Sequence, residues 1–135
     1  MMNQIPKDVN EFIAIQKNFY FNQWRGRERP CPAFQNEIIY ATRSGWEHIN
    51  ASKRTISELC SRLELLPHAK KLLEISTTYQ SFKKDKDGIT KYWKFTGFIL
   101  SKWVTVIVRQ KGASHKHIYS VFTHSRPKCL GIRKK

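Results

Sequence analysis

Residues 91–124, KYWKFTGFILSKWVTVIVRQKGASHKHIYSVFTH, decide the fold that this sequence predicts. Three runs rich in aromatic and β-branched residues are separated by short polar breaks, which is typical of consecutive antiparallel strands. In the middle run Val104, Val106 and Val108 occupy every second position. Alternate side chains of a strand face opposite sides, so one face of this strand is all valine and is expected to lie against a core. The other face carries aromatic and polar side chains and ends in Arg109.

The third run predicts a similar division of side chains. Its alternation places His117, Tyr119 and Val121 on one face and Ile118 and Ser120 on the other. The many Arg, His, Tyr, Ser and Thr residues make these strands too polar for a sheet that only fills a core. We therefore interpret the sheet as a scaffold that presents a site.

Helices are expected before this sheet. Apolar residues recur with helical spacing in residues 9–21, and a short strand is expected at residues 37–42. Thr55 followed by Glu58 has the capping-box pattern of a helix start, just before an apolar run. Pro67 suits the first turn of a further helix.

A hairpin signal separates these helices from the three strands. Asp87-Gly88 follows a β-prone segment at residues 77–83, which supplies a fourth strand. Helices that precede a late antiparallel sheet predict an α+β fold. We expect N-terminal helices packed on a C-terminal four-stranded antiparallel sheet.

The chain is expected to have three parts. Residues 1–36 would form an N-terminal helix and a basic arm, in which Pro30 and Pro32 prevent regular helix. Residues 37–125 would form the α+β domain, and residues 126–135 a basic tail.

The charge of the chain indicates a polyanionic partner. The 135 residues include 25 Lys and Arg against 10 Asp and Glu, which gives a formal net charge of +15 at pH 7. A basic balance of this size is most often associated with nucleic acid. No apolar run approaches the roughly 20 residues that span a bilayer, so no membrane partner is expected. The first residues lack an apolar secretory segment, so a cytoplasmic location is expected, in the producing cell or in a target cell.

The sequence predicts neither a metal nor a cofactor. Its 10 carboxylates are scattered, and only Asp85 and Asp87 lie close together, in a turn. Two-metal nucleases need convergent carboxylates. Cys31, Cys60 and Cys129 have no CxxC spacing, so neither a zinc site nor a disulfide framework is supported.

The side chains that remain suit RNA cleavage without a metal. This reaction needs a base for the proton of the 2′-hydroxyl, an acid for the leaving oxygen, and cations or hydroxyls on the phosphorane oxygens. Histidine suits proton transfer near neutral pH, and Arg, Lys and hydroxyl side chains stabilise the developing charge. The product would be a 2′,3′-cyclic phosphate, because attack by the 2′-hydroxyl needs neither metal nor water.

Candidate residues for this chemistry come from the strands and from the helix before them. The expected catalytic residues are His48, Arg109, Tyr119 and Ser120. The residues expected to bind RNA are Lys53, Lys94, Lys116, His117 and Thr123.

His48 and His117 are the best candidates for proton transfer. We expect His48 in the first turn of a helix that begins near Trp46, where free N–H groups favour a nearby phosphate. His117 lies on the strand face opposite Ser120, so these two residues share a site only if a bulge intervenes. His48 has no such conflict and is the preferred catalytic histidine.

Several segments resemble a known group of nucleases. They are RSGWEHI at residues 43–49, ELCSRLELLPHAKKLLE at residues 58–74, and the strands YWKF, VTVIVRQ and HIYSVF. Their order resembles the phage-type members of the BECR ribonucleases, the superfamily of barnase, EndoU, colicin D and RelE-like proteins. The resemblance spans most of the chain after residue 36. It implies a metal-independent RNase, often a toxin, with helices before a four-stranded antiparallel sheet and with functional His48, Arg109 and Ser120.

Other functions remain open at this point. A non-catalytic RNA- or DNA-binding protein would use the same charge, with Trp93, Phe95 and Tyr119 stacking on bases. A basic protein-interaction module is a third possibility. For a nuclease, the resemblance to colicin D-like members suggests transfer RNA, and the resemblance to RelE-like members suggests messenger RNA. An intracellular toxin would need an acidic immunity or antitoxin protein, expected to cover the face from Arg109 to His117.

Overall fold

The strand with the valine face is an inner strand of a four-stranded antiparallel sheet in the computed structural model, which describes residues 7–51 and 55–123. The strands follow chain order, β3–β4–β5–β6. Their bounds are Ser81–Lys84, Thr90–Ile99, Lys102–Lys111 and His117–Phe122. Val104, Val106 and Val108 each have an exposed fraction of 0%, so the predicted core face of β5 is confirmed.

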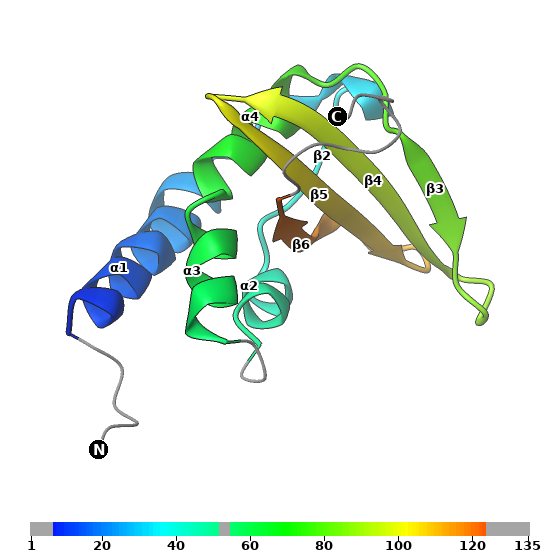
Figure 1. Cartoon of the computed structure of the whole chain (residues 1–135). Helices are drawn as coiled ribbons and strands as arrows, with labels where there is room; N and C mark the ends of the chain where they lie inside the picture. The colour runs from blue at the N-terminus through cyan, green and yellow to red at the C-terminus, as the bar shows by residue number, and fades with distance from the viewer. Residues whose placement is uncertain (1–6, 52–54, 124–135) are drawn as a thin grey trace, which may run out of the picture.

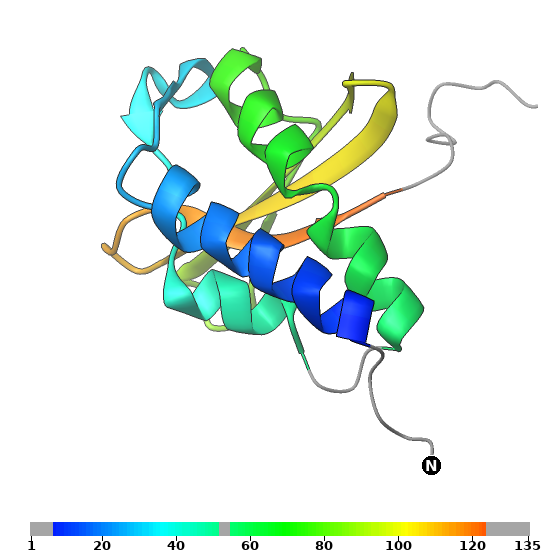
Figure 2. The ribbon, with the colours of Figure 1, turned by 90° about the vertical axis from the view of Figure 1, so that its left-hand side faces the viewer.

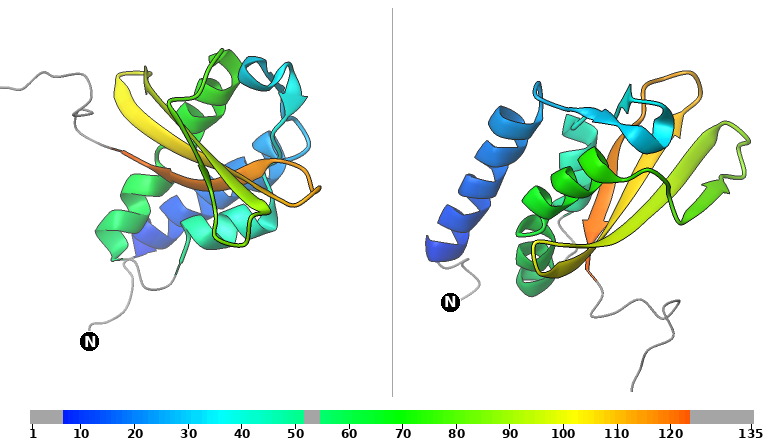
Figure 3. Two further views of the ribbon diagram at one scale, coloured as in Figure 1. Left: turned by 90° about the vertical axis from the view of Figure 1, so that its right-hand side faces the viewer. Right: turned by 90° about the horizontal axis from the view of Figure 1, so that it is seen from above.

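Helices pack on one face of this sheet, and no helix lies over the other face among the described residues (Figure 1, Figure 3). In chain order they are α1 (Lys7–Asn18), the π-helix η1 (Phe19–Trp24), α2 (Arg43–Ile49), α3 (Ile56–Leu63) and α4 (Leu66–Ile75). α1 lies on the far side of α2 and α3 from the sheet (Figure 2). The expected α+β arrangement of N-terminal helices and a C-terminal antiparallel sheet is confirmed. In the described ranges no helix is long and apolar enough to cross a membrane.

The starts of α3 and α4 follow local signals in the sequence. The hydroxyl of Thr55 accepts a hydrogen bond from the Glu58 N–H, and the Glu58 carboxylate accepts one from the Thr55 N–H, each at 3.0 Å. The predicted capping box is therefore confirmed. Pro67 lies in the first turn of α4, where backbone N–H groups have no partner within the helix. The N–H that proline lacks therefore costs no helical hydrogen bond. α4 then buries Leu72 and Leu73 against the sheet, with exposed fractions of 4% and 5%.

The hairpin between β3 and β4 is closed by Asp87, as its Asp-Gly signal predicted. The Asp87 carboxylate accepts hydrogen bonds from the Thr90 hydroxyl (2.6 Å), the Thr90 N–H (2.8 Å) and the Ile89 N–H (2.9 Å). These bonds, with that of the Thr90 hydroxyl foremost, hold the pKa of Asp87 below its usual value. The first strand is shorter than the segment at 77–83 suggested, since β3 begins at Ser81.

Residues of η1 also enter the hydrophobic core. Tyr20 and Trp24 have exposed fractions of 0% and 2%, and their ring centroids lie 5.6 Å apart. The Tyr20 hydroxyl donates a hydrogen bond to the carbonyl of Thr42 at 2.7 Å. This contact ties η1 to the chain just before α2.

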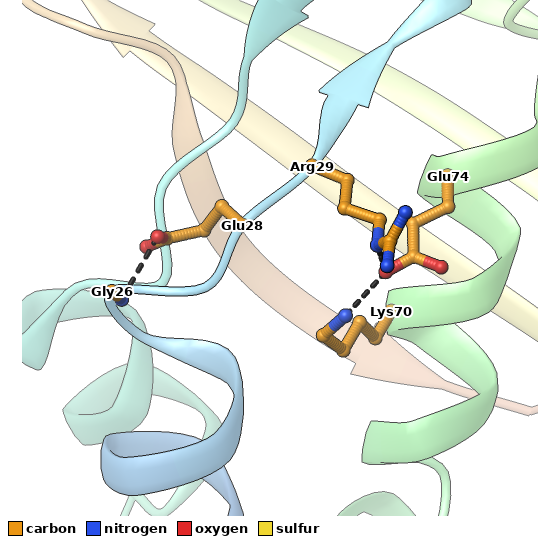
Figure 4. Close-up of polar contacts among 5 residues, drawn as sticks. All are labelled: Gly26, Glu28, Arg29, Lys70 and Glu74. Carbon is orange, nitrogen blue, oxygen red and sulfur yellow. Dashed lines mark hydrogen bonds and ion pairs between the residues drawn. The ribbon is translucent and has the colours of Figure 1, made fainter.

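A small sheet joins this N-terminal part to α4. β1 (Pro30–Cys31) pairs with β2 (Glu37–Ile38), and the short 3₁₀ helix η2 (Pro32–Phe34) connects them. Arg29, just before β1, lies 4.0 Å from the carboxylate of Glu74, which also pairs with Lys70 (Figure 4). The strand predicted at residues 37–42 is thus limited to β2, followed by a parallel bridge between Tyr40 and His117.

The predicted alternation of side chains along β6 is wrong beyond Tyr119. Val108 pairs with Ile118, but Ile107 pairs with Ser120, so Tyr119 is an extra residue in β6. Such a β-bulge sets two residues of one strand opposite one residue of its neighbour and reverses the alternation that follows. His117 and Ser120 therefore pair with β5 residues of the same face, although simple alternation separates them.

The predicted start of the helix that carries His48 is also wrong. α2 begins at Arg43, and the hydroxyl of its N-cap residue Thr42 accepts a hydrogen bond from the Gly45 N–H at 3.1 Å. Arg43, Ser44 and Gly45, which precede the predicted start near Trp46, thus form the first turn of the helix. His48 lies in the last turn of α2, so the expected helix start at this histidine is absent.

We predict that Gly45→Ala destabilises the protein by about 1–3 kcal/mol or more, since overpacked sites cost this much. A Cβ atom at residue 45 would lie 2.2 Å from the carbonyl oxygen of Ile118 and 2.8 Å from the Tyr20 hydroxyl. Urea unfolding would measure the loss, with Glu47→Ala as the control at an exposed position of α2. Equal stability of the two variants would show that α2 does not need this close approach to β6.

Candidate functional site

The face of the sheet without helical cover carries the polar side chains that the sequence analysis singled out. Tyr92 pairs with Arg109, and Lys94 pairs with Ile107, so these four residues lie on one face. The neighbouring pairs Trp93–Val108 and Phe95–Val106 face the core. We call the uncovered side the open face.

A pocket of about 400 Å³ lies on the open face. We call it the sheet pocket, and it is lined by Ser81, Lys83, Asp85, Tyr92, Trp93, Lys94, Ile107 and Tyr119. Its lining crosses the sheet from β3 to β6 and includes two lysines and one aspartate. The pocket therefore offers aromatic rings and cations together.

Arg109 lies next to this pocket and is held by side chains from two other elements. Its Nε donates a hydrogen bond to Nε2 of His117 at 3.1 Å, and its Nη2 donates one to the hydroxyl of Ser44 at 3.4 Å. Its guanidinium carbon lies 4.4 Å from the ring centroid of Tyr119, in a cation–π contact. These contacts fix the position of the guanidinium group.

His48 approaches the same tyrosine from α2. The rings of His48 and Tyr119 are stacked, with centroids 3.9 Å apart and an angle of 20° between their planes. Tyr92 meets the Tyr119 ring edge-on at 5.4 Å. Ser44 and His48 are four residues apart in α2, which places both on one face of the helix. We call Ser44, His48, Arg109, His117 and Tyr119 the Arg109 cluster.

His117 is a buried member of this cluster. Burial, and next the positive charge of Arg109, lower the pKa of His117 below 6.5, while a hydrogen bond to the backbone of His115 opposes them. At neutral pH the imidazole is therefore uncharged, as an acceptor for the Arg109 Nε–H requires. His117 acts as a support for Arg109 in this arrangement.

The structure gathers some of the predicted site residues and separates others. His48, Arg109, His117 and Tyr119 meet in the Arg109 cluster, and Lys94 lines the adjoining sheet pocket.

The remaining predicted residues lie elsewhere. The hydroxyl of Ser120 accepts a hydrogen bond from Arg62 of α3 at 3.0 Å. Lys116 pairs with Glu37 at 2.8 Å, and its ammonium lies over the rings of Phe34 and Trp93 on the core side of the sheet.

Two predicted RNA-binding residues remain to be placed. The Thr123 hydroxyl donates a hydrogen bond to the carbonyl of Trp103 at 2.6 Å. Lys53 lies outside the described residues.

Two of the three aromatic residues proposed to stack on bases are buried. Phe95 is fully buried and Trp93 is 7% exposed, because both point toward the core. Tyr92 and Ser44 belong to the site but were not expected there. Tyr92 could have been found from the sequence, because it is two residues before Lys94 and alternation places both on one face. Ser44 could not have been found from the sequence, because its contact with Arg109 depends on where α2 packs.

Comparisons of this chain with protein-family models, with curated proteins and with solved structures find no significant match. In residues 7–51 and 55–123, no group of three or more His, Cys, Asp and Glu side chains is placed to hold a metal ion.

We predict that replacing His117 by Gln reduces the loss of stability in acid. Because the pKa of His117 is lowered by folding, the unfolded chain binds more protons in acid than the folded chain does. The stability that neutral His117 contributes is therefore fully present above about pH 6.5. It is lost as the pH falls through the pKa of His117 in the folded protein. Gln keeps a hydrogen-bond acceptor but does not titrate. Urea unfolding at about pH 7.5 and about pH 5 would compare the two proteins. The same decrease in unfolding free energy for both would mean that His117 does not control this pH dependence.

Proposed function

We propose that this protein is a metal-independent endoribonuclease of the toxin-like kind, which cleaves RNA by attack of a 2′-hydroxyl. The observation that supports the proposal is the Arg109 cluster, in which a fixed guanidinium group and a histidine contact the same tyrosine ring. The net charge of +15 favours RNA as the partner.

Phosphate binding and one of the two proton transfers have candidate groups in this arrangement. His48 would take the proton from the 2′-hydroxyl or give one to the leaving 5′-oxygen, and water would transfer the other proton. The 2′-oxygen then bonds to phosphorus while the bond to the 5′-oxygen breaks, which leaves a 2′,3′-cyclic phosphate and a 5′-hydroxyl. Arg109 and Lys94 would bind the phosphate oxygens, whose negative charge grows during the reaction.

The fixed position of Arg109 is what makes this assignment chemically reasonable. A guanidinium group that is already oriented loses little conformational freedom when a phosphate binds. His117, Ser44 and Tyr119 hold it without adding negative charge. The positive charge of Arg109 is therefore left for a phosphate.

The resemblance to BECR ribonucleases supports the same function. The chain has helices followed by a four-stranded antiparallel sheet, as that superfamily does. The residues that correspond to its functional His and cation, His48 and Arg109, both contact Tyr119. Ser120, for which the resemblance implied a hydroxyl role, instead contacts Arg62, so we assign it no step.

We predict that the purified protein cleaves RNA in the presence of EDTA, and that His48→Ala lowers the rate by roughly 100-fold or more, the usual contribution of a proton-transfer group. His117→Ala is expected to weaken cleavage less, because His117 acts through Arg109. The assay follows total RNA on denaturing gels and the 2′,3′-cyclic phosphate at product ends. Lys71→Ala, which removes an exposed charge on α4, is the control.

Two results would contradict this mechanism. Complete loss of cleavage in EDTA would show that a metal is required. A His48→Ala variant with an unchanged circular dichroism spectrum and the wild-type rate would show that His48 has no part in proton transfer.

A second candidate function is binding of RNA without cleavage. It is favoured by Phe98 and Trp103, which lie on the open face beyond Lys94 with ring centroids 5.4 Å apart, Phe98 being 60% exposed. Exposed aromatic rings beside cations suit single-stranded nucleic acid. A binder would leave RNA intact even at high protein excess, and Arg109→Ala would then lower its affinity.

A toxin of this kind would have an acidic protein partner in the cell that makes it. Such an immunity or antitoxin protein would cover the open face, where Lys83, Lys94 and Arg109 lie. We predict that its association rate falls by about tenfold or more between low and high ionic strength, because opposite charges steer the encounter. Stopped-flow mixing with a candidate partner would measure the rate. A rate that does not depend on salt would argue against an electrostatic interface.

A further inference from the structure

Another pocket, of about 470 Å³, includes in its lining His117, the residue that accepts a hydrogen bond from Arg109. We call it the loop pocket, and it is lined by Arg25, Gly26, Glu28, Tyr40, Ala41, Thr42, Ser114, His115 and His117. These residues come from the segment after η1, the segment before α2, the loop between β5 and β6, and the first position of β6. None of the predicted catalytic residues lines it.

The walls of the loop pocket are held in place by hydrogen bonds. One carboxylate oxygen of Glu28 accepts from the Gly26 N–H at 2.8 Å (Figure 4), and the other accepts from the Ala41 N–H at 3.1 Å. Tyr40 is joined to β6 by its N–H, which donates to the Lys116 carbonyl, and by its carbonyl, which accepts from the Ile118 N–H. These hydrogen bonds hold the shape of the pocket.

The side chains that line the loop pocket suit a ligand in which a planar aromatic ring lies close to a negatively charged group. Tyr40 and His115 lie with ring centroids 5.0 Å apart at an angle of 52°. Arg25 adds a cation at the rim. Unstacked bases of single-stranded RNA bind to tyrosine, histidine and arginine side chains of this kind.

Arg109 connects the loop pocket to the sheet pocket. It donates to His117, which lines the loop pocket, and lies over Tyr119, which lines the sheet pocket. An RNA strand with one phosphate at Arg109 would therefore lie close to a lining residue of each pocket.

We propose that the loop pocket is a base-binding subsite, which holds the nucleobase of a nucleotide adjacent to the phosphate bound by Arg109. This inference rests on the proposed function for the place of the phosphate. The base stacks on Tyr40 and His115, and the loop pocket thereby selects which phosphate of a single-stranded RNA reaches Arg109.

The test uses a single-stranded RNA of about ten nucleotides, enough to cover one binding module. Its 2′-hydroxyls are methylated, so it cannot supply the attacking oxygen, and the fluorescent base 2-aminopurine is placed at one position at a time. Stacking on an aromatic side chain quenches this fluorophore. We expect quenching that depends on Tyr40 and His115 at one position of the bound RNA.

The variants separate the subsite from general binding. Tyr40→Leu and His115→Ala should each restore the fluorescence at that position, and Tyr40→Leu should raise the Kd by about fivefold or more, the lower range for loss of a stacked base. Tyr79→Leu is the matched control, since Tyr79 is 37% exposed and lines neither pocket. The backbone contacts of Tyr40 do not involve its ring, and His115 is exposed, so at least one of these variants is expected to fold.

The outcomes distinguish this proposal from the nuclease proposal. Cleavage of unmodified RNA by a protein that quenches no position, or whose quenching survives both variants, would overturn the subsite and leave the nuclease standing. Quenching that both variants abolish, without cleavage of unmodified RNA, would support the subsite and overturn the nuclease. Cleavage whose base preference is lost in Tyr40→Leu and kept in Tyr79→Leu would support both.

Discussion

The close approach of α2 to β6 at Gly45 is the constraint on which the candidate site depends. The position of a Cβ atom at this residue is already occupied by the carbonyl oxygen of Ile118, so only glycine allows this distance. Ser44 is the neighbour of Gly45, and His48 is one turn further along the same helix. Ser44 reaches Arg109 and His48 reaches Tyr119 because the helix backbone rests directly on the strand.

The site holds its arginine without a carboxylate. Within residues 7–51 and 55–123, the contacts described for Arg109 are with a neutral imidazole, a hydroxyl and an aromatic ring. Lys116, in the same strand region, shows the opposite solution, since it pairs with Glu37 and lies over two rings. Lys116 is thus paired with a carboxylate, whereas the described contacts of Arg109 are with neutral groups.

Much of the fold could be predicted because its signals are local. The valine alternation of β5, the capping box at Thr55 and the Asp87 turn each depend on a few neighbouring residues. The site was predictable only in part. His48, Arg109 and Tyr119 stand out by residue type, but the place of Ser120 depends on an extra residue in β6, and the contact of Ser44 depends on how α2 packs. Neither the place of Ser120 nor the contact of Ser44 can be predicted from residue type or spacing.

The extra residue in β6 gives this surface an unusual sensitivity to chain length. A substitution at Tyr119 changes one ring and keeps the bulge, whereas removal of that residue would restore regular pairing, with Ser120 still opposite Ile107, and would take away the position from which a ring contacts both Arg109 and His48. Related proteins could therefore keep the same amino acids in this region and still lose the site through a single deletion. Alignments of such proteins need to be judged by the number of residues between His117 and Val121 as well as by their identity.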